Sequence, residues 1–449
     1  MNWHWRAYCS CLLGCLFFLS TFHARADLWN TGYYPGYRQN TMPASVVDFS
    51  ALTHVIHFAL IPNSDGTLNS SLNVVSAPNS SDLISKAHAA GKPVLISVGG
   101  AGSSFPAATS SQNVGKFTTN IVNFMVSRGY DGVDIDWEPI LASETNQFAT
   151  FITMLRAQLD TIAPRPLLTT AVAWQPQVFA TLQDKFDQIN IMTYDMSGTW
   201  PGWVTWHNAP LFDGGYNFPS TGKPVPSTET MVNNFINAGV QPEKLGIGIA
   251  FYGKVWSGGA GTTNGGATDP RQSWSTAPIV TSASFNAIMT TYYQTNRYHW
   301  DTNAQAAYLS IDNAGSADDK FISYDDERSC QTKVSYARNR RLGGVMIWEL
   351  GQGYRSGEPA GKREPLLQAI KAALATPGIV SIERTNQNVQ LSFSSLHLGQ
   401  YSVLWSTNPG SENWNTLTTN LIGTGANLLV IDTNAVSQPH RFYRIQTPP

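Results

Sequence analysis

Residues 131–139 read DGVDIDWEP, and apolar and acidic side chains alternate strictly from position 133 to position 138. Side chains on a β-strand point alternately to its two faces, and residues two apart lie about 6.6 Å from one another. Asp134, Asp136 and Glu138 therefore share one face of a predicted strand, and the apolar side chains between them, Trp137 included, share the other. In a closed barrel of parallel strands, such a strand turns its acids inward and its apolar groups toward the helices.

This acidic row is the candidate catalytic centre. Burying several unpaired carboxylates is costly, so the members of such a row share protons and their pKa values separate. One carboxyl can then stay protonated near neutral pH and act as an acid. Glu138 lies at the carboxyl end of the strand, where barrel enzymes place their chemistry, and is the predicted general acid. Asp136 can hydrogen-bond to Glu138 or to substrate, and Asp134 can hold the proton that Asp136 releases.

Two other interpretations fit the row less well. A polar edge strand with solvated acids fits poorly, because the residues that flank the acids are apolar. A calcium site normally places its oxygen ligands on a curved loop with a Gly turn, which this strand lacks. The spacing of about 6.6 Å falls at the short end of the range for inverting glycosidases, so spacing alone allows inversion through a bound water.

The rest of the chain predicts an α/β fold, a (β/α)8 TIM barrel. Near-continuous apolar strands separated by helical patterns indicate a parallel sheet that is covered on its faces. The apolar runs are residues 29–34, 54–60, 93–98, 132–136, 167–172, 189–193, 245–249 and 343–347. A doubly wound open sheet is the alternative. It usually carries a Gly-rich phosphate turn after its first strand, where this chain reads YYPGY.

Two segments depart from the barrel pattern. Residues 253–321 are too long for a plain loop and predict a small α+β insertion between the seventh and eighth strands. The catalytic barrel is predicted for residues 27–375, and residues 376–378 for a linker. Beyond the linker, residues 379–449 alternate with a period of two and contain frequent turns, which predicts a small sandwich-like all-β domain.

Composition restricts the partners of this chain. It has 449 residues with 28 Lys and Arg against 30 Asp and Glu, for a formal net charge of −2. This balance provides no surface that would neutralise phosphates, so nucleic acid is not an expected partner. Charged residues make up only 13%, and 14 tryptophans are present. An uncharged polar surface of this kind is typical of extracellular proteins that bind neutral ligands such as sugars.

The amino terminus predicts secretion. In residues 1–26, Arg6 precedes a short apolar run, and Ala24-Arg25-Ala26 forms a cleavage pattern, as in a secretory signal peptide. The mature protein is expected outside the cytoplasm, extracellular or periplasmic, with no membrane attachment. A lipoprotein processing site at Cys15 is the alternative. Cleavage leaves Cys330 as the remaining cysteine, and we expect it to be a buried small apolar residue.

Residues 131–139 closely resemble the DGxDxDxE signature of family 18 glycoside hydrolases, the chitinase family. Further segments agree in the right order: residues 97–100 resemble the SxGG of the third strand, 192–195 the MxYD of the sixth, 323–326 the segment before the last helix–strand unit, and 343–349 the eighth strand with its Trp. Phe251-Tyr252-Gly253, before the long insertion, resembles the seventh strand and the chitinase insertion domain. The resemblance covers residues 27–375 and leaves out the C-terminal segment.

The resemblance implies retaining, substrate-assisted hydrolysis of chitin or N-acetylglucosamine oligosaccharides, by a monomer without metal or cofactor. Glu138 would protonate the glycosidic oxygen and later act as base for water. Asp136, supported by Asp134, would stabilise attack of the 2-acetamido group on the anomeric carbon, giving an oxazolinium ion. Tyr194 would donate to the acetamido oxygen. The other positions expected to bind substrate are Asp195, Met192, Trp348 as the apolar floor, Tyr33, Tyr252 and Trp137.

One position departs from the family pattern. Lys254 stands where relatives often have Arg; it keeps the charge but loses the planar fork, which affects a predicted substrate contact and not the activity. Tryptophans on predicted loops or in the insertion either stack on sugar faces or pack: Trp174, Trp200, Trp203, Trp206, Trp256 and Trp300. In the C-terminal segment, a carbohydrate-binding module or a spacer, Trp405 and Trp414 belong either to a sugar-binding face or to the core.

Three functions remain open from the sequence. A chitinase that cleaves β-1,4-linked N-acetylglucosamine leads. A non-hydrolytic chitin lectin is the second, although such family members usually lack the last acid of the motif, which Glu138 supplies in this chain. The third is an endo-β-N-acetylglucosaminidase acting on N-glycans. Those enzymes often replace the Tyr and the Trp that this chain keeps as Tyr194 and Trp348.

Overall fold

The computed structural model describes residues 28–375, 378–395, 399–411, 413–424, 426–435 and 440–447. The predicted signal segment, residues 1–26, lies outside these ranges, as do positions 376 and 377 of the predicted linker. Within the described residues no helix is both apolar enough and long enough to cross a bilayer.

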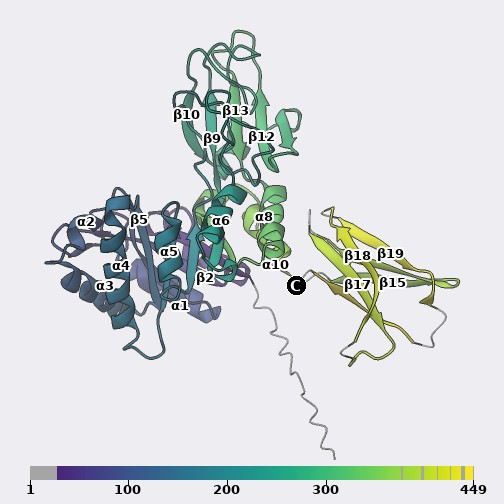
Figure 1. Cartoon of the computed structure of the whole chain (residues 1–449), viewed down its shortest axis with the longest axis horizontal. Helices are drawn as coiled ribbons and strands as arrows, with labels where there is room; N and C mark the ends of the chain where they lie inside the picture. Colours follow the sequence, from purple (N-terminus) through teal and green to yellow (C-terminus); the bar gives the residue numbers. More distant parts are fainter. Residues whose placement is uncertain are drawn as a thin grey trace, which may run out of the picture.

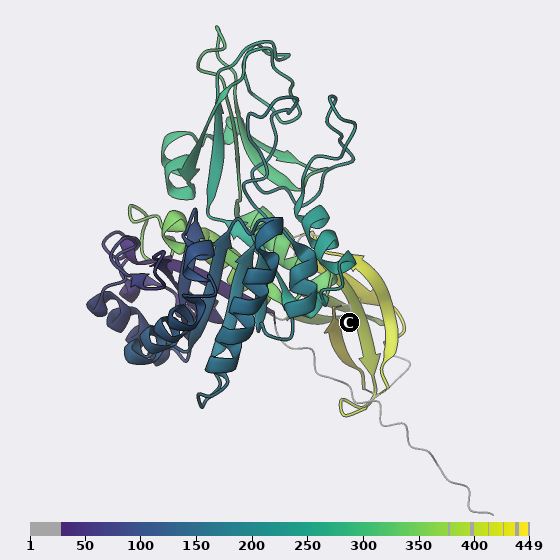
Figure 2. The same ribbon diagram turned by 60° about the vertical axis from the view of Figure 1, so that its left-hand side comes forward.

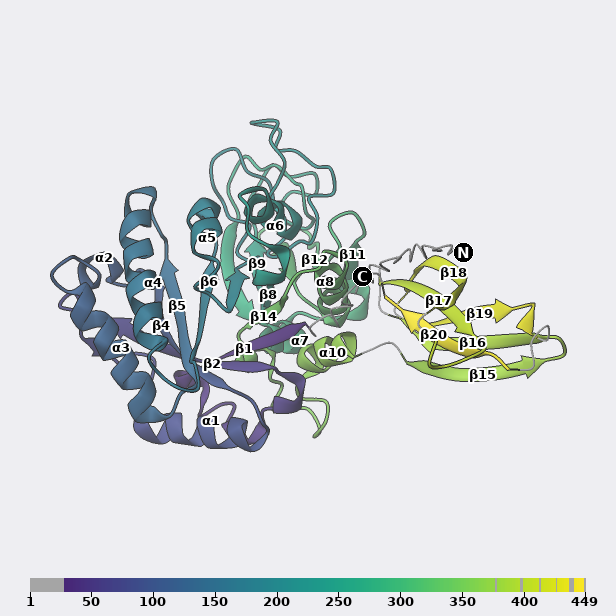
Figure 3. The same ribbon diagram turned by 60° about the horizontal axis from the view of Figure 1, so that its bottom comes forward.

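A closed parallel barrel forms the body of the chain (Figure 3). In the described part of the chain, its strands are β1 (Trp29–Pro35), β2 (His54–Pro62), β4 (Val94–Ala101), β5 (Gly132–Glu138), β6 (Leu167–Val172), β7 (Gln188–Ile191), β8 (Leu245–Ala250) and β14 (Gly344–Trp348). They follow the order β1-β14-β8-β7-β6-β5-β4-β2, and pairing of β1 with β2 closes the ring. The short strand β3 (Leu68–Asn69) adds to β2 as a hairpin. The predicted (β/α)8 barrel is confirmed, and the doubly wound alternative is wrong.

Helices surround this barrel. The longer ones are α1 (Ala77–Ala89), α3 (Val114–Arg128), α4 (Thr145–Leu159), α5 (Pro176–Leu182), α6 (Thr228–Asn237), α8 (Glu327–Asn339) and α10 (Pro365–Leu374), with the short α2 (Phe105–Ala108) and α9 (Leu350–Gly353). Local sequence sets their ends. The side chain of Ser227 caps α6 by accepting from the backbone of Thr230, and Gly129 ends α3 with a φ of 78°.

The strand β5 shows how sequence alternation builds the core. Val133 and Ile135 are completely buried and belong to the apolar cluster between the barrel and its helices. Trp137 lies on the same face, where its ring stacks on that of Phe105 with centroids 4.7 Å apart. The apolar face thus packs outward, which leaves the acidic face for the barrel interior.

An antiparallel sheet with one helix rises above the barrel (Figures 1 and 2). It spans 252–324, all of which the structure describes: β9 (Tyr252–Ser257), β10 (Ile279–Ser284), α7 (Phe285–Thr291), β11 (Tyr298–Asp301), β12 (Ala306–Ile311) and β13 (Lys320–Tyr324). The strand order is β10-β9-β13-β12-β11. Since β9 follows β8 directly, the insertion begins at the carboxyl end of a barrel strand, beside the predicted site.

Two small antiparallel sheets follow the barrel (Figure 1). In the described parts of residues 378–447, one sheet contains β15 (Ile379–Thr385), β16 (Asn388–Ser394) and β19 (Asn427–Asp432), and the other β17 (Gln400–Ser406), β18 (Asn415–Ile422) and β20 (Phe442–Gln446). Guanidinium carbons lie 3.7 Å from the ring centroid of Trp405 and 4.9 Å from that of Trp414. The faces of these two rings are therefore partly covered by arginine side chains.

Candidate active site

Asp134 forms the inner end of the acidic row and is fully buried. Its Oδ2 accepts hydrogen bonds from the hydroxyls of Tyr33 at 2.9 Å and Ser97 at 3.0 Å, and its Oδ1 accepts one from Thr169 at 2.7 Å. Burial raises the pKa of Asp134 to about 6, and the three hydroxyl donors oppose that rise. The three hydroxyls hold this side chain in one orientation beneath Asp136.

Asp136 and Glu138 form the outer end of the row. Asp136 is 2% exposed, and among the described residues no group hydrogen-bonds to its buried Oδ1. Burial raises the pKa of Asp136 well above its usual range, and the nearby charges of Glu138 and Asp134 raise it further. Burial also raises the pKa of Glu138, while a hydrogen bond with Asp136 opposes that rise. The two carboxyls thus share a proton, which Asp136 holds more tightly and donates to Glu138.

A second polar group faces Glu138 from the loop after β7. The carboxylate of Asp195 pairs with Lys254, with Oδ1 and Nζ 2.6 Å apart, and also accepts a hydrogen bond from the hydroxyl of Tyr252. Its negative charge contributes to the raised pKa of Glu138. The position that departs from the family pattern, Lys254, therefore serves to hold Asp195.

Tyr194 supplies a hydroxyl near both the acidic row and Asp195. Burial raises the pKa of Tyr194 well above its usual range, and the charges of Tyr252, Asp136 and Glu138 raise it further. The hydroxyl therefore remains protonated and able to donate a hydrogen bond. Its contact within the described protein is the sulfur of Met346 at 3.8 Å, which leaves its donor capacity largely unused.

Aromatic rings close the bottom of the site. The indole of Trp348 meets the ring of Phe58 edge-on, with centroids 4.8 Å apart, and the ring of Tyr33 at 5.4 Å. Tyr33 is fully buried and Trp348 only partly. Tyr33 thereby joins this aromatic floor to the carboxylate of Asp134.

The barrel wall behind the acids requires glycine. Gly99 on β4 pairs with Asp136 on β5 and has a φ of +123°. A Cβ atom at this position would lie 2.0 Å from the carbonyl oxygen of Asp136. The SxGG segment therefore allows two strands to approach closely, and its Ser97 additionally donates a hydrogen bond to Asp134.

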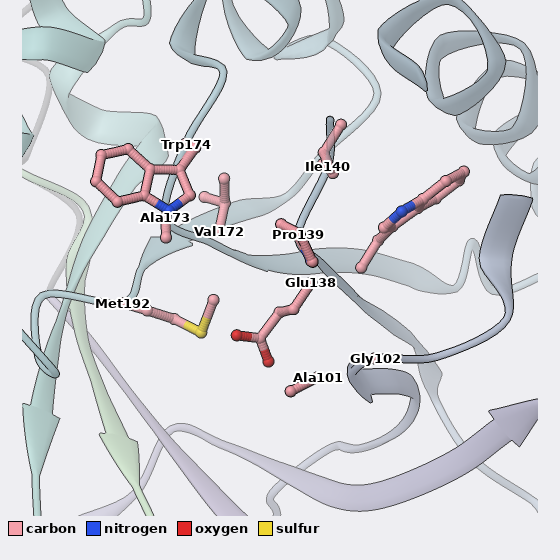
Figure 4. A pocket seen from close by; sticks show the side chains of 10 residues that line it. Ala101, Gly102, Glu138, Pro139, Ile140, Val172, Ala173, Trp174 and Met192 are labelled. Carbon is pink, nitrogen blue, oxygen red and sulfur yellow. The ribbon is translucent and has the colours of Figure 1, made fainter. Parts of the chain in front are cut away.

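Two hollows meet at Glu138. The larger one, of about 720 Å³, extends from Glu138 and Tyr194 past Trp174 and Trp200 to the start of α6. The smaller one, of about 220 Å³, lies between Trp174 and the segment of Ala101 and Gly102. Figure 4 shows the carboxyl of Glu138 pointing into this hollow, between the side chains of Met192 and Ala101, with the indole of Trp174 on the Met192 side.

The tryptophans predicted on loops or in the insertion have three kinds of surroundings. Trp174 is 65% exposed and Trp200 is 49% exposed, and both line the larger hollow with Trp203 beside them. Trp206 and Trp256 are completely buried and pack within the core. Trp300 lies under the guanidinium group of Arg328, 4.0 Å from its ring centroid.

The structure brings most of the predicted residues together and adds two. Glu138, Asp136, Asp134, Tyr194, Asp195, Tyr252, Trp348, Tyr33 and Met192 all surround the same end of the barrel. Trp137 lines the smaller hollow but stacks outward on Phe105. Sequence reasoning missed Phe58, which packs on the aromatic floor, and Asn208, whose Oδ1 accepts from the backbone of Asp195 at 3.2 Å. Neither residue belongs to a motif that marks it.

Comparisons with known proteins agree with this arrangement. The family model described as glycosyl hydrolases family 18 matches residues 30–353. Chitinase A1 of Niallia circulans is 29% identical over 334 residues, which are 66% of this chain and 44% of that protein. Chitinase 1 of Aphanocladium album is 31% identical over 273 residues, 57% of this chain and 60% of that protein. The chain thus spans about half the length of these curated relatives.

Solved structures share the fold. A Group IV chitinase of Ostrinia furnacalis, in complex with allosamidin, superposes with a TM-score of 0.66 at 23% identity, over 78% of this chain and 99% of that one. A family 18 N-acetylglucosaminidase of Paenibacillus barengoltzii gives 0.62 at 25% identity, over 77% and 100%. The matched family region contains the acidic row, Tyr194 and Trp348, and it covers most of the sequence. The chain therefore belongs to glycosyl hydrolase family 18.

Proposed function

We propose that this protein is a chitinase that hydrolyses β-1,4-N-acetylglucosaminide bonds in chitin and chitooligosaccharides. The observation that carries the proposal is the pairing of Glu138, at the mouth of an open cleft, with the buried carboxyl of Asp136. The relatives from Niallia circulans and Aphanocladium album are chitinases, and a class V chitinase of Cycas revoluta with a similar fold is solved in complex with (GlcNAc)3.

The proposed reaction retains the configuration of the anomeric carbon. Glu138 gives its proton to the glycosidic oxygen while the carbonyl oxygen of the substrate's own 2-acetamido group attacks the anomeric carbon. The glycosidic bond breaks and an oxazolinium ion forms. Because the nucleophile belongs to the substrate, attack is intramolecular and a second carboxylate nucleophile is not required. Glu138 then takes a proton from water as that water opens the ring.

Asp136 stabilises the charge that develops in this step. Its Oδ1 is buried and has no hydrogen-bond partner among the described residues, so it can accept the N–H of the acetamido group. As the oxazolinium becomes positive, the negative charge on Asp136 becomes favourable, so the shared proton passes from Asp136 to Glu138 and from Glu138 to the glycosidic oxygen, which leaves both carboxyls as anions. Asp134, fixed by three hydroxyls, stays close beneath Asp136 throughout.

The remaining residues bind the reacting sugar. Tyr194 has a protonated hydroxyl whose donor capacity is largely unused, which suits the acetamido oxygen. Trp348 offers an indole that Phe58 and Tyr33 hold edge-on, which suits the apolar face of a sugar ring. Among the described residues no three His, Cys, Asp or Glu side chains gather as a metal site, and the scheme needs none.

Mass spectrometry of the products from a chitin hexamer tests the proposal. A chitinase gives shorter β-1,4-linked N-acetylglucosamine oligosaccharides, and their sizes report whether cleavage occurs at the ends or within the chain. Binding of the hexamer without products would indicate a lectin. Hydrolysis of an N-glycan core with the hexamer left intact would indicate an endo-β-N-acetylglucosaminidase.

We further propose that Trp174 stacks on a sugar of the bound chain close to Glu138. It is 65% exposed and borders both hollows that meet at this acid. Stacking between aromatic rings contributes about 0.5–1.5 kcal/mol, and a gain of the same size from a sugar face means that Trp174→Ala should raise KM for the hexamer by about 2- to 12-fold.

The matched variant Trp174→Phe keeps an aromatic face and should restore much of the affinity. Steady-state kinetics of both variants with the hexamer measure the difference. An unchanged KM in Trp174→Ala would show that this ring does not contact substrate.

A further inference from the structure

The backbone of Asp195 adopts an unusual conformation beside the reacting acids. Its φ of 56° lies in the left-handed region, which residues other than glycine enter at a cost. Two hydrogen bonds to one residue hold it there. The backbone N–H of Asp195 donates to Oδ1 of Asn208 at 3.2 Å, and that of Met196 donates to the carbonyl oxygen of Asn208 at 3.0 Å. Asn208 is 1% exposed, so these bonds are shielded from water.

Asn208 is itself held by the insertion. Its backbone N–H donates to Oγ of Ser323 on β13 at 3.0 Å, and its Nδ2 lies 3.4 Å from the carbonyl oxygen of Tyr252 on β9. All four polar groups of this one residue are thus engaged. Two of them face the loop of Asp195, and two face strands of the insertion.

A buried polar network extends this link into the insertion. Oγ of Ser323 lies 3.1 Å from Nδ1 of His207, and Nε2 of His207 lies 3.0 Å from the carboxylate of Asp301 on β11. Arg271 completes the network through an ion pair with Asp301 at 2.5 Å. His207 and Ser323 are essentially inaccessible to solvent, so the arrangement serves to hold structure and not to contact substrate.

The position of Asp195 matters for the proposed reaction. Its carboxylate pairs with Lys254 and accepts from the hydroxyl of Tyr252, and its charge acts on Glu138. A relaxed backbone at residue 195 would move this carboxylate relative to both partners. A misplacement of about 1 Å at a reacting centre can lower the rate by about 10²-fold.

We propose that Asn208 is a positioning residue that fixes Asp195 in its left-handed conformation and thereby couples the insertion, through Ser323, to the reacting centre. The inference rests on the proposed chitinase activity, because the charge of Asp195 acts on Glu138, the acid of that reaction. The insertion would then position Asp195, in addition to any contact that the insertion makes with the chitin chain.

Asn208→Ala should lower kcat on an aryl β-chitobioside by about 10²-fold and change KM much less. Ser323→Ala removes the acceptor of the Asn208 N–H together with the contact to His207. It should lower kcat in the same direction by a smaller factor, and it provides the test if the first variant does not fold. The matched control is Asn30→Ala, a fully buried asparagine on β1 whose Nδ2 donates to the carbonyl oxygen of Ala51 at 2.8 Å, and it should keep kcat.

A double-mutant cycle identifies the route of the effect. In an Asp195→Ala background, Asn208→Ala should lower kcat by less than about 3-fold, because both changes remove the same contribution. Multiplicative losses in the double variant would overturn the proposal. A crystal structure of Asn208→Ala decides it independently of any activity, because residue 195 should leave the left-handed region, and an unchanged residue 195 would also overturn it. Failure of the chitinase assignment would appear instead as a lack of hydrolysis by the unmodified protein.

Discussion

Replacing Glu138 by Gln should lower kcat on an aryl β-chitobioside by about 10²- to 10⁴-fold, the usual contribution of a general acid or base. The amide keeps the size of the side chain and loses the proton that the glycosidic oxygen needs. The loss should exceed that from a change at Asp136, Trp174 or Asn208, because Glu138 acts twice, first as acid and then as base. Steady-state release of the chromophore measures it.

Binding should survive the same change. Glu138 contributes one carboxyl to a cleft of about 720 Å³. Calorimetry should therefore show that chitotetraose binds to Glu138→Gln with nearly the affinity that it has for the unmodified protein. The affinity of the unmodified protein is measured under conditions in which it does not hydrolyse the ligand. The matched control is Glu243→Gln, an exposed glutamate before β8 at the opposite end of the barrel, and it should leave kcat unchanged. Near-normal turnover by Glu138→Gln would end the assignment of this residue as the acid.

Asp136→Asn should produce the second largest loss, about 10²-fold or more in kcat with little change in KM. An amide has nearly the shape of the carboxyl but cannot become an anion when the oxazolinium forms. It also cannot pass a carboxyl proton to Glu138. The aryl chitobioside assay measures this loss, and a variant that retains most of its kcat would contradict the role of Asp136.

Stability separates this chemical loss from misfolding. In the folded chain the pKa of Asp136 lies above its ordinary value of 3.8. As pH rises from about 4, the folded chain therefore binds more protons than the unfolded chain. The free energy of unfolding then falls with rising pH. Asparagine removes that titration. Asp136→Asn should therefore unfold at a higher temperature than the unmodified protein at about pH 7, with a smaller advantage at about pH 4. Calorimetry at both pH values provides the control.

The sequence predicted the barrel well because each strand carries its own signal. The apolar run at 167–172 matches β6 residue for residue, and the run at 245–249 matches β8 except for the last residue of that strand. Residues 189–193 were a less accurate prediction. The strand β7 ends at Ile191, because the chain turns there and the N–H of Thr193 bonds back to the carbonyl of Ile191. The local pattern of apolar residues does not reveal where a strand stops pairing with its neighbours.

The site was predictable only where residues follow a motif. Strand alternation places Asp134, Asp136 and Glu138, because the two-residue period puts all three side chains on the same face of β5. The contacts of Asn208 depend on an irregular segment between β7 and α6 and on strands of the insertion, more than 40 residues away in sequence for Tyr252 and more than 100 for Ser323. The same limit applies to the tryptophans, whose exposure depends on how the loops fold.

The stereochemistry of hydrolysis tests the central claim most directly. Proton NMR of chitotetraose during the first turnovers distinguishes the anomers of the new reducing ends before they interconvert. Substrate-assisted attack predicts that the β-anomer appears first. Early release of the α-anomer would mean that a water molecule bound between the carboxyls attacks the anomeric carbon directly. That result would contradict the proposed roles of Asp136 and the acetamido group.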